Sequence, residues 1–64
     1  MTPTELRLPN NMTRNIVLLN SGILDFAFYK DGMFRLQGTE DWFLPFHIKQ
    51  WMSIEDLKST LSIR

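Results

Sequence analysis

Apolar and polar positions between residues 14 and 37 follow the alternation that is typical of β-strands. The run Ile16–Leu19 is apolar at every position, as expected for a strand that is covered on both faces. Residues 23–29 alternate large apolar side chains with small or polar ones, and residues 33–37 continue the pattern. Lys30–Asp31–Gly32 is the strongest turn signal in the chain. We therefore expect three consecutive antiparallel strands joined by short turns.

The register of the second hairpin decides which side chains face the core. A two-residue Asp31–Gly32 loop places Phe28 opposite Arg35, whereas a three-residue loop that also includes Lys30 places Phe28 opposite Phe34. A slip of one residue moves every side chain of a strand to the other face. Because the second arrangement matches apolar side chains across the strands, we predict the three-residue loop.

The first hairpin is predicted to turn at residues 20–22. This turn places Ile16 opposite Phe26 and Leu18 opposite Leu24. Together the two registers define one predicted core face. It comprises Ile16, Leu18, Leu24, Phe26, Phe28, Phe34 and Leu36.

The opposite face of the same strands is too apolar for free exposure to water. It carries Val17, Leu19, Ile23, Asp25, Ala27, Tyr29, Met33 and Arg35. Two interpretations stay open: the rest of the chain covers part of this face, or the face is a dimer interface or a wall that contacts a ligand. The candidate self-association residues are Val17, Leu19, Ile23, Ala27 and Met33.

The segments outside the hairpins predict an extended start and a helical end. Two prolines and two asparagines in residues 1–13 favour an extended segment, and the alternation of residues 46–51 predicts a further strand. Ser53 is a typical helix N-cap, and the two acidic residues in the following turn favour the positive end of the helix dipole. We predict a helix over 53–61 with an apolar stripe. The stripe comprises Ile54, Leu57 and Leu61.

These elements predict one mainly β domain over residues 1–64, with an extended segment at 1–13, the strands within 14–52 and the helix last. The strands form either a four- to five-stranded antiparallel meander or an SH3-like barrel, with one short C-terminal helix. A chain of 64 residues buries only about 60% of the surface that its unfolded form exposes. With so many apolar side chains, a homodimer or a higher oligomer is therefore expected.

Charge and residue types exclude several classes of function. Seven basic and seven acidic side chains balance, so the basic footprint that binds duplex nucleic acid is missing. There is no cysteine and one histidine, His47, around which no metal-ligand spacing occurs, so we expect no metal and no cofactor. No nucleophile motif or glycine-rich phosphate loop is present, so an enzyme is not expected. The longest apolar run has four residues and no secretion signal is found, which predicts a cytoplasmic protein without membrane contact.

Aromatic and basic side chains are the strongest chemical signal in the chain. The candidate binding residues are Tyr29, Arg35, Trp42, Lys49 and Trp51. Tryptophan, tyrosine and arginine are enriched among the residues that dominate protein interfaces, and the same types can stack on a base and hold its phosphate. A structural interpretation also stays open, in which Trp42 and Trp51 only cover the ends of the sheet.

Four short motifs resemble those of a family of small phage and prophage domains of unknown function. The matching positions are Leu8–Pro9, Ile16–Leu19, Phe28–Tyr29 through Gly32 to Phe34, and Trp51–Met52. The chain departs from that family where a tryptophan usually precedes the leucine–proline start, and Gln50 stands where a histidine often precedes the final tryptophan. The family has no settled activity, so no functional residue is carried over. The resemblance implies a phage-type accessory protein in the host cell cytoplasm.

The expected function is that of a small non-enzymatic binding protein. In the setting that the resemblance implies, it inhibits or sequesters a host defence component by stoichiometric binding. Two alternatives remain: a sponge for a small nucleotide signal that uses aromatic stacking and Arg or Lys contacts to phosphate, and a structural or assembly subunit. The expected partners are thus a second copy of the chain and either a host protein or a small nucleotide.

Overall fold

The computed structural model describes residues 1–62, so the last two residues of the predicted domain lie outside the described part. Within the described residues the chain forms six antiparallel strands in one sheet and one helix after them, which confirms the predicted mainly β fold class. The strand order is β1–β6–β2–β3–β4–β5. The elements are β1 (Thr2–Pro3), β2 (Thr13–Leu19), β3 (Leu24–Lys30), β4 (Met33–Leu36), β5 (Trp42–Phe43), a 3-10 turn (Pro45–His47), β6 (Ile48–Ser53) and α1 (Ile54–Ser62).

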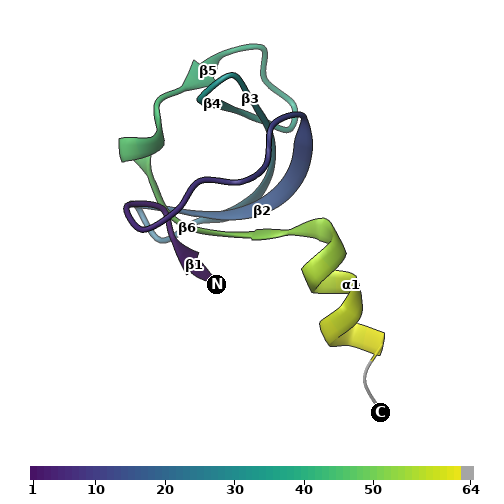
Figure 1. Ribbon diagram of the computed structural model, residues 1–64. Helices are drawn as coiled ribbons and strands as arrows, with labels where there is room; N and C mark the ends of the chain where they lie inside the picture. The colour runs from purple at the N-terminus through teal and green to yellow at the C-terminus, as the bar shows by residue number, and fades with distance from the viewer. Residues whose placement is uncertain (63–64) are drawn as a thin grey trace.

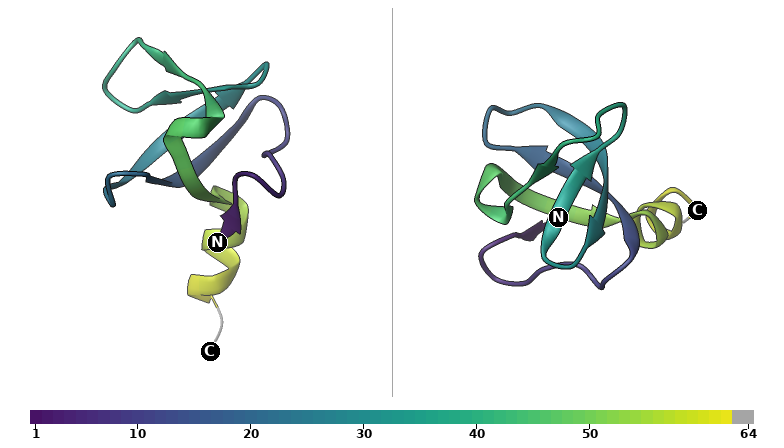
Figure 2. Two further views of the ribbon diagram at one scale, coloured as in Figure 1. Left: turned by 90° about the vertical axis from the view of Figure 1, so that its left-hand side faces the viewer. Right: turned by 90° about the horizontal axis from the view of Figure 1, so that it is seen from above.

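The sheet curls around a single core without closing, because its edge strands β1 and β5 do not pair with each other (Figures 1 and 2). Strands β2 to β5 follow one another as a meander, as predicted, but β6 returns across the molecule and pairs with β1 and β2. The strand predicted over 46–51 begins later, at Ile48, because Pro45 starts a 3-10 turn that includes Phe46 and His47.

The predicted register is correct for the first hairpin and wrong for the second. Strands β2 and β3 pair as expected, with Ile16 opposite Phe26. Strands β3 and β4 are joined by the two-residue Asp31–Gly32 loop, which places Phe28 opposite Arg35. Asp31 and Gly32 have φ angles of 50° and 85°, and positive φ at both positions is the turn that matches the right-handed twist of a hairpin. Local turn geometry therefore outweighs the apolar match across the strands.

Because the predicted register was wrong by one residue, the side chains of β2 and β3 were assigned to the wrong faces of the sheet. The buried core consists of Val17, Ala27, Tyr29, Phe34, Ile48 and Trp51. Phe34 is buried as predicted and Leu36 packs against the core, but Phe26 and Leu24 are exposed on the outside. Val17 and Ala27, predicted for self-association, are interior residues and Leu19 packs on the core, so this face is not free for a second copy. β6 covers it, through Ile48 and Trp51.

The N-terminal segment closes one end of the curled sheet. β1 pairs with β6, and the Thr4 amide donates to the Lys49 carbonyl over 3.0 Å. The indole Nε1 of Trp51 donates to the Arg7 carbonyl over 2.7 Å, which ties the loop after β1 to the core. Most of the predicted extended segment is irregular, as expected, although its short strand is Thr2–Pro3.

The helix begins where the sequence predicted and then leaves the sheet. Ser53 Oγ accepts a hydrogen bond from the Asp56 amide over 3.0 Å, which confirms the N-cap. α1 projects from the body of the molecule, and none of its described residues is buried (Figure 1). The apolar stripe does not cover the sheet, and Leu61 is 74% exposed. Within residues 1–62, no helix has the length and apolar character needed to cross a membrane.

Candidate functional site

A row of alternating cationic and aromatic side chains crosses the outer face of the sheet. Strand register places Arg14 of β2 opposite Phe28 of β3, Phe28 opposite Arg35 of β4, and Arg35 opposite Trp42 of β5. Cross-strand partners point to the same face of a sheet, and neighbouring strands lie about 4.8 Å apart. These four residues therefore form one continuous strip, which we call the cation–aromatic row.

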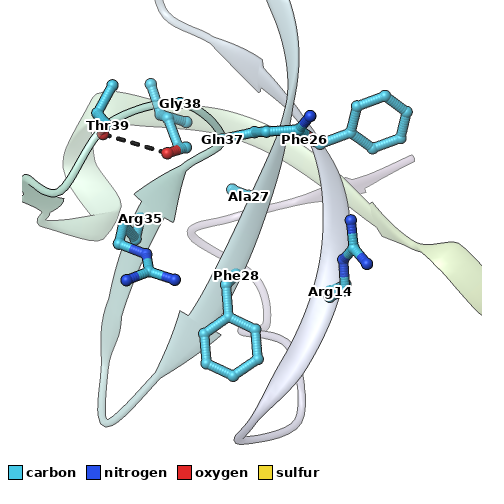
Figure 3. A pocket seen from close by; sticks show the side chains of 9 residues that line it. Arg14, Phe26, Ala27, Phe28, Arg35, Gln37, Gly38 and Thr39 are labelled. Atoms are coloured by element: carbon cyan, nitrogen blue, oxygen red, sulfur yellow. Dashed lines mark hydrogen bonds between the residues drawn. The ribbon is translucent and has the colours of Figure 1, made fainter.

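One end of the row is fixed by a cation–π contact. The guanidinium carbon of Arg35 lies 5.4 Å from the centroid of the Trp42 ring, and Trp42 is 38% exposed. This contact orients the Arg35 side chain along the surface. Figure 3 shows the Phe28 ring between the guanidinium groups of Arg14 and Arg35.

A shallow hollow of about 350 Å³ lies beside the row. Phe26 and Phe28 of β3 line the hollow, and the turn after β4 brings Gln37 and Thr39 to its rim (Figure 3). Thr39 Oγ1 donates to the Leu36 carbonyl over 3.1 Å, which holds this turn in place. Figure 3 draws no hydrogen bond from either guanidinium to another lining residue.

The charge on this face differs from that of the whole chain. The outward positions of β2, β3, β4 and β5 carry three cationic side chains and no acidic one. The cationic residues are Arg14, Lys30 and Arg35. A chain of zero net charge therefore presents a locally cationic face, because its acidic residues lie in loops, on the inner side of β3 or in α1. The same face continues toward β6 as an apolar surface that contains Ile16 and Met52 as cross-strand partners.

The structure brings together two of the five predicted binding residues. Arg35 and Trp42 lie in the row. Tyr29 and Trp51 are core residues, 6% and 5% exposed, and Tyr29 packs on Phe34 with ring centroids 4.9 Å apart, so the structure places them in the interior and outside the row. For Trp51, the structural interpretation is the one that the burial supports. Lys49 is exposed on β6 and lies outside the row, next to the Leu18–Leu19 end of β2 rather than to Arg14.

Arg14, Phe26 and Phe28 are the site residues that sequence reasoning missed. Phe26 and Phe28 had been assigned to the core, and Arg14 had no role. The signal that finds them is the Asp31–Gly32 turn, because its two-residue register places Phe28 opposite Arg35 and hence on the outside.

The chemistry of the hollow is set by cationic, aromatic and neutral polar groups. Its lining contains guanidinium, aromatic, amide and hydroxyl groups, but no carboxylate, histidine or cysteine. Across the described part of the chain, no group of three or more potential metal-ligating His, Cys, Asp or Glu residues occurs.

Comparison with known proteins provides no relative. No family model, no curated protein and no solved structure matches the chain. The resemblance to small phage and prophage domains therefore stays a prediction.

Proposed function

We propose that this chain is a small non-enzymatic binding protein that acts by stoichiometric occupation of a partner through the cation–aromatic row. One observation carries the proposal: Arg14, Phe28, Arg35 and Trp42 are aligned across four strands on the outer face. Arginine and tryptophan are the residue types that most often dominate binding energy at interfaces. Placing them on adjacent strands fixes their spacing, which lowers the entropy lost on binding.

The site chemistry defines what the partner must offer. Exposed guanidinium groups favour a ligand with carboxylate or phosphate oxygens, and the neighbouring rings favour a flat or apolar group. The absence of a titratable acid or base from the hollow's described lining supports capture rather than turnover. In the phage-type setting that the resemblance implies, such capture would inhibit or sequester a component of the host.

The experiment compares two variants of the immobilised protein, each with added negative charge, in a bacterial lysate. Arg14→Glu/Arg35→Glu changes the row, and Phe46→Glu/Lys49→Glu changes two exposed residues elsewhere as a matched control. Both the protein and the small-molecule fractions that are retained are identified by mass spectrometry. We expect a component that binds at a fixed molar ratio to the wild type and to the control, and that is lost from the row variant. Equal retention by all three proteins would contradict the proposal and leave the structural or assembly function.

A further inference from the structure

The ring of Phe28 on β3 narrows the class of ligand, given the proposed binding function of this face. Phe26 and Phe28 both lie on the outer face of β3, but Figure 3 shows their rings pointing in different directions, with the Phe28 ring between Arg14 and Arg35. Aromatic groups stack at about 3.5 Å, close to the optimum carbon–carbon contact distance. A single flat ring can therefore stack on Phe28, between the two arginines.

The two guanidinium groups lie within reach of the phosphate of a nucleotide whose base stacks on Phe28. Arg14 and Arg35 flank Phe28 on the two neighbouring strands, so their backbones lie about 10 Å apart with the ring position between them. Arginine binds phosphate through two parallel hydrogen bonds, and its long side chain can turn toward a group above the neighbouring ring. No acidic side chain occupies an outward position of β2 to β5, and Glu55 of α1, which lines a second hollow with Arg14, is accompanied there by Lys58.

The rim of the hollow supplies groups that can contact the edge of a base. Gln37 offers an amide that both donates and accepts, and Thr39 a hydroxyl, and both line the hollow that Phe26 and Phe28 border. A volume of about 350 Å³ is near the lower end for small-molecule sites, which fits one nucleotide unit.

We infer that the outer face binds a nucleotide, with its base stacked on Phe28 and its phosphate held by Arg14 and Arg35. The same chemistry is presented by a free nucleotide and by one unit of an unpaired nucleic-acid strand. Duplex nucleic acid is excluded as a ligand of this kind, because its bases are already stacked and paired and cannot stack on Phe28.

The test uses four probes on the full-length protein. Adenosine 5′-diphosphate and a single-stranded adenine tetranucleotide carry base and phosphate, whereas adenosine and inorganic pyrophosphate carry one group each. We expect at least one of the first two to bind and each of the last two to bind at least tenfold more weakly. Tighter binding of the diphosphate assigns the site to free nucleotides, and tighter binding of the tetranucleotide assigns it to single strands. Binding is followed by calorimetry and by quenching of the exposed Trp42.

Variants assign the two kinds of contact separately. Phe28→Ala is expected to weaken binding about 5- to 100-fold, the effect of removing one stacking partner. Arg35→Gln is expected to lower affinity and to make the logarithmic salt dependence of tetranucleotide binding shallower by about 0.7, as for one lost phosphate contact. Phe46→Ala and Lys49→Gln, at exposed positions elsewhere, should leave affinity unchanged. Phe28→Leu, with circular dichroism, separates lost stacking from lost folding.

The outcomes also separate this inference from the proposed function. If no nucleotide probe binds but a protein is retained by the wild type and lost from the row variant, the nucleotide inference is wrong and the binding function stands. If probe binding is unchanged by Phe28→Ala and Arg35→Gln, nucleotides bind elsewhere and the inference fails. If neither a nucleotide nor a lysate component depends on the row, both proposals fail.

Discussion

The two faces of the strand pair β2–β3 are both apolar, but the inner face is buried and much of the outer face is exposed. The inner face buries Val17, which is 0% exposed, and Ala27, whereas the outer face leaves Leu24 57% exposed and Phe26 41% exposed. At the centre of this strand pair the larger side chains are thus on the outside, whereas the inner face buries its large ring, Tyr29, toward the end of β3. Curvature explains this distribution, because the concave side of a curled sheet has little room at its centre and takes small residues there. Where both faces of a strand are apolar, sheet geometry decides which face is buried.

The largest expected difference in stability between the two faces comes from removing one aromatic ring from each face. Phe34→Ala on the inner side is expected to lower the free energy of unfolding by about 3–5 kcal/mol, because Phe34 is fully buried. Phe26→Ala on the outer side should cost less than about 1 kcal/mol. Urea denaturation followed by circular dichroism measures both. Equal losses would mean that the outer face is covered in solution.

The two tryptophans provide a second and smaller contrast. Trp51→Phe removes the 2.7 Å hydrogen bond to the Arg7 carbonyl and leaves that acceptor unpaired, for an expected loss of about 1–3 kcal/mol. Trp42→Phe retains an exposed ring and should change stability by less than about 0.5 kcal/mol. Acrylamide should quench the remaining fluorescence strongly in Trp51→Phe, which retains Trp42, and weakly in Trp42→Phe. The reverse pattern would contradict the assignment of the two faces.

The Asp31–Gly32 turn determines which side chains of β3 face the core, and one substitution tests it. Gly32 has a φ of 85° and no atom within 4 Å of a Cβ placed on it, so Gly32→Ala adds backbone strain without a clash. The expected loss is about 1–2 kcal/mol in thermal or urea unfolding. Gly32→Asn is the control and should cost less, because asparagine tolerates positive φ. If alanine were as stable as glycine, the two-residue turn would be wrong.

The smallest expected effect lies in the helix. Ser53→Ala removes the N-cap hydrogen bond to Asp56, which should cost about 0.5 kcal/mol and reduce the helical signal in circular dichroism. Because α1 buries none of its described residues, the sheet should unfold at nearly the same urea concentration. Ser53→Asp retains a capping oxygen and should behave as the wild type. A large drop in sheet stability would show that the helix packs on the body.

The sequence predicted which segments form the main strands better than it predicted their environment, and it predicted four to five strands where the structure has six. The first hairpin, the Ser53 cap and the mainly β class follow from local patterns that the fold respects. The return of β6 to β2 is a long-range pairing without a local signal. Arg35 and Trp42 were predicted as site residues from their types alone. Their alignment with Arg14 and Phe28 could not be predicted. It depends on the two-residue turn, whereas the apolar match across the strands favoured the three-residue loop.

Both edge strands of the sheet are two residues long, and this limits how the molecule can bind other chains. β1 and β5 offer only a few free backbone groups, so another chain has little template for adding a strand. A protein with much exposed apolar surface is thereby protected against aggregation through its sheet edges. Recognition is left to side chains on the broad outer face, where a change of single residues can alter the choice of ligand without changing the fold.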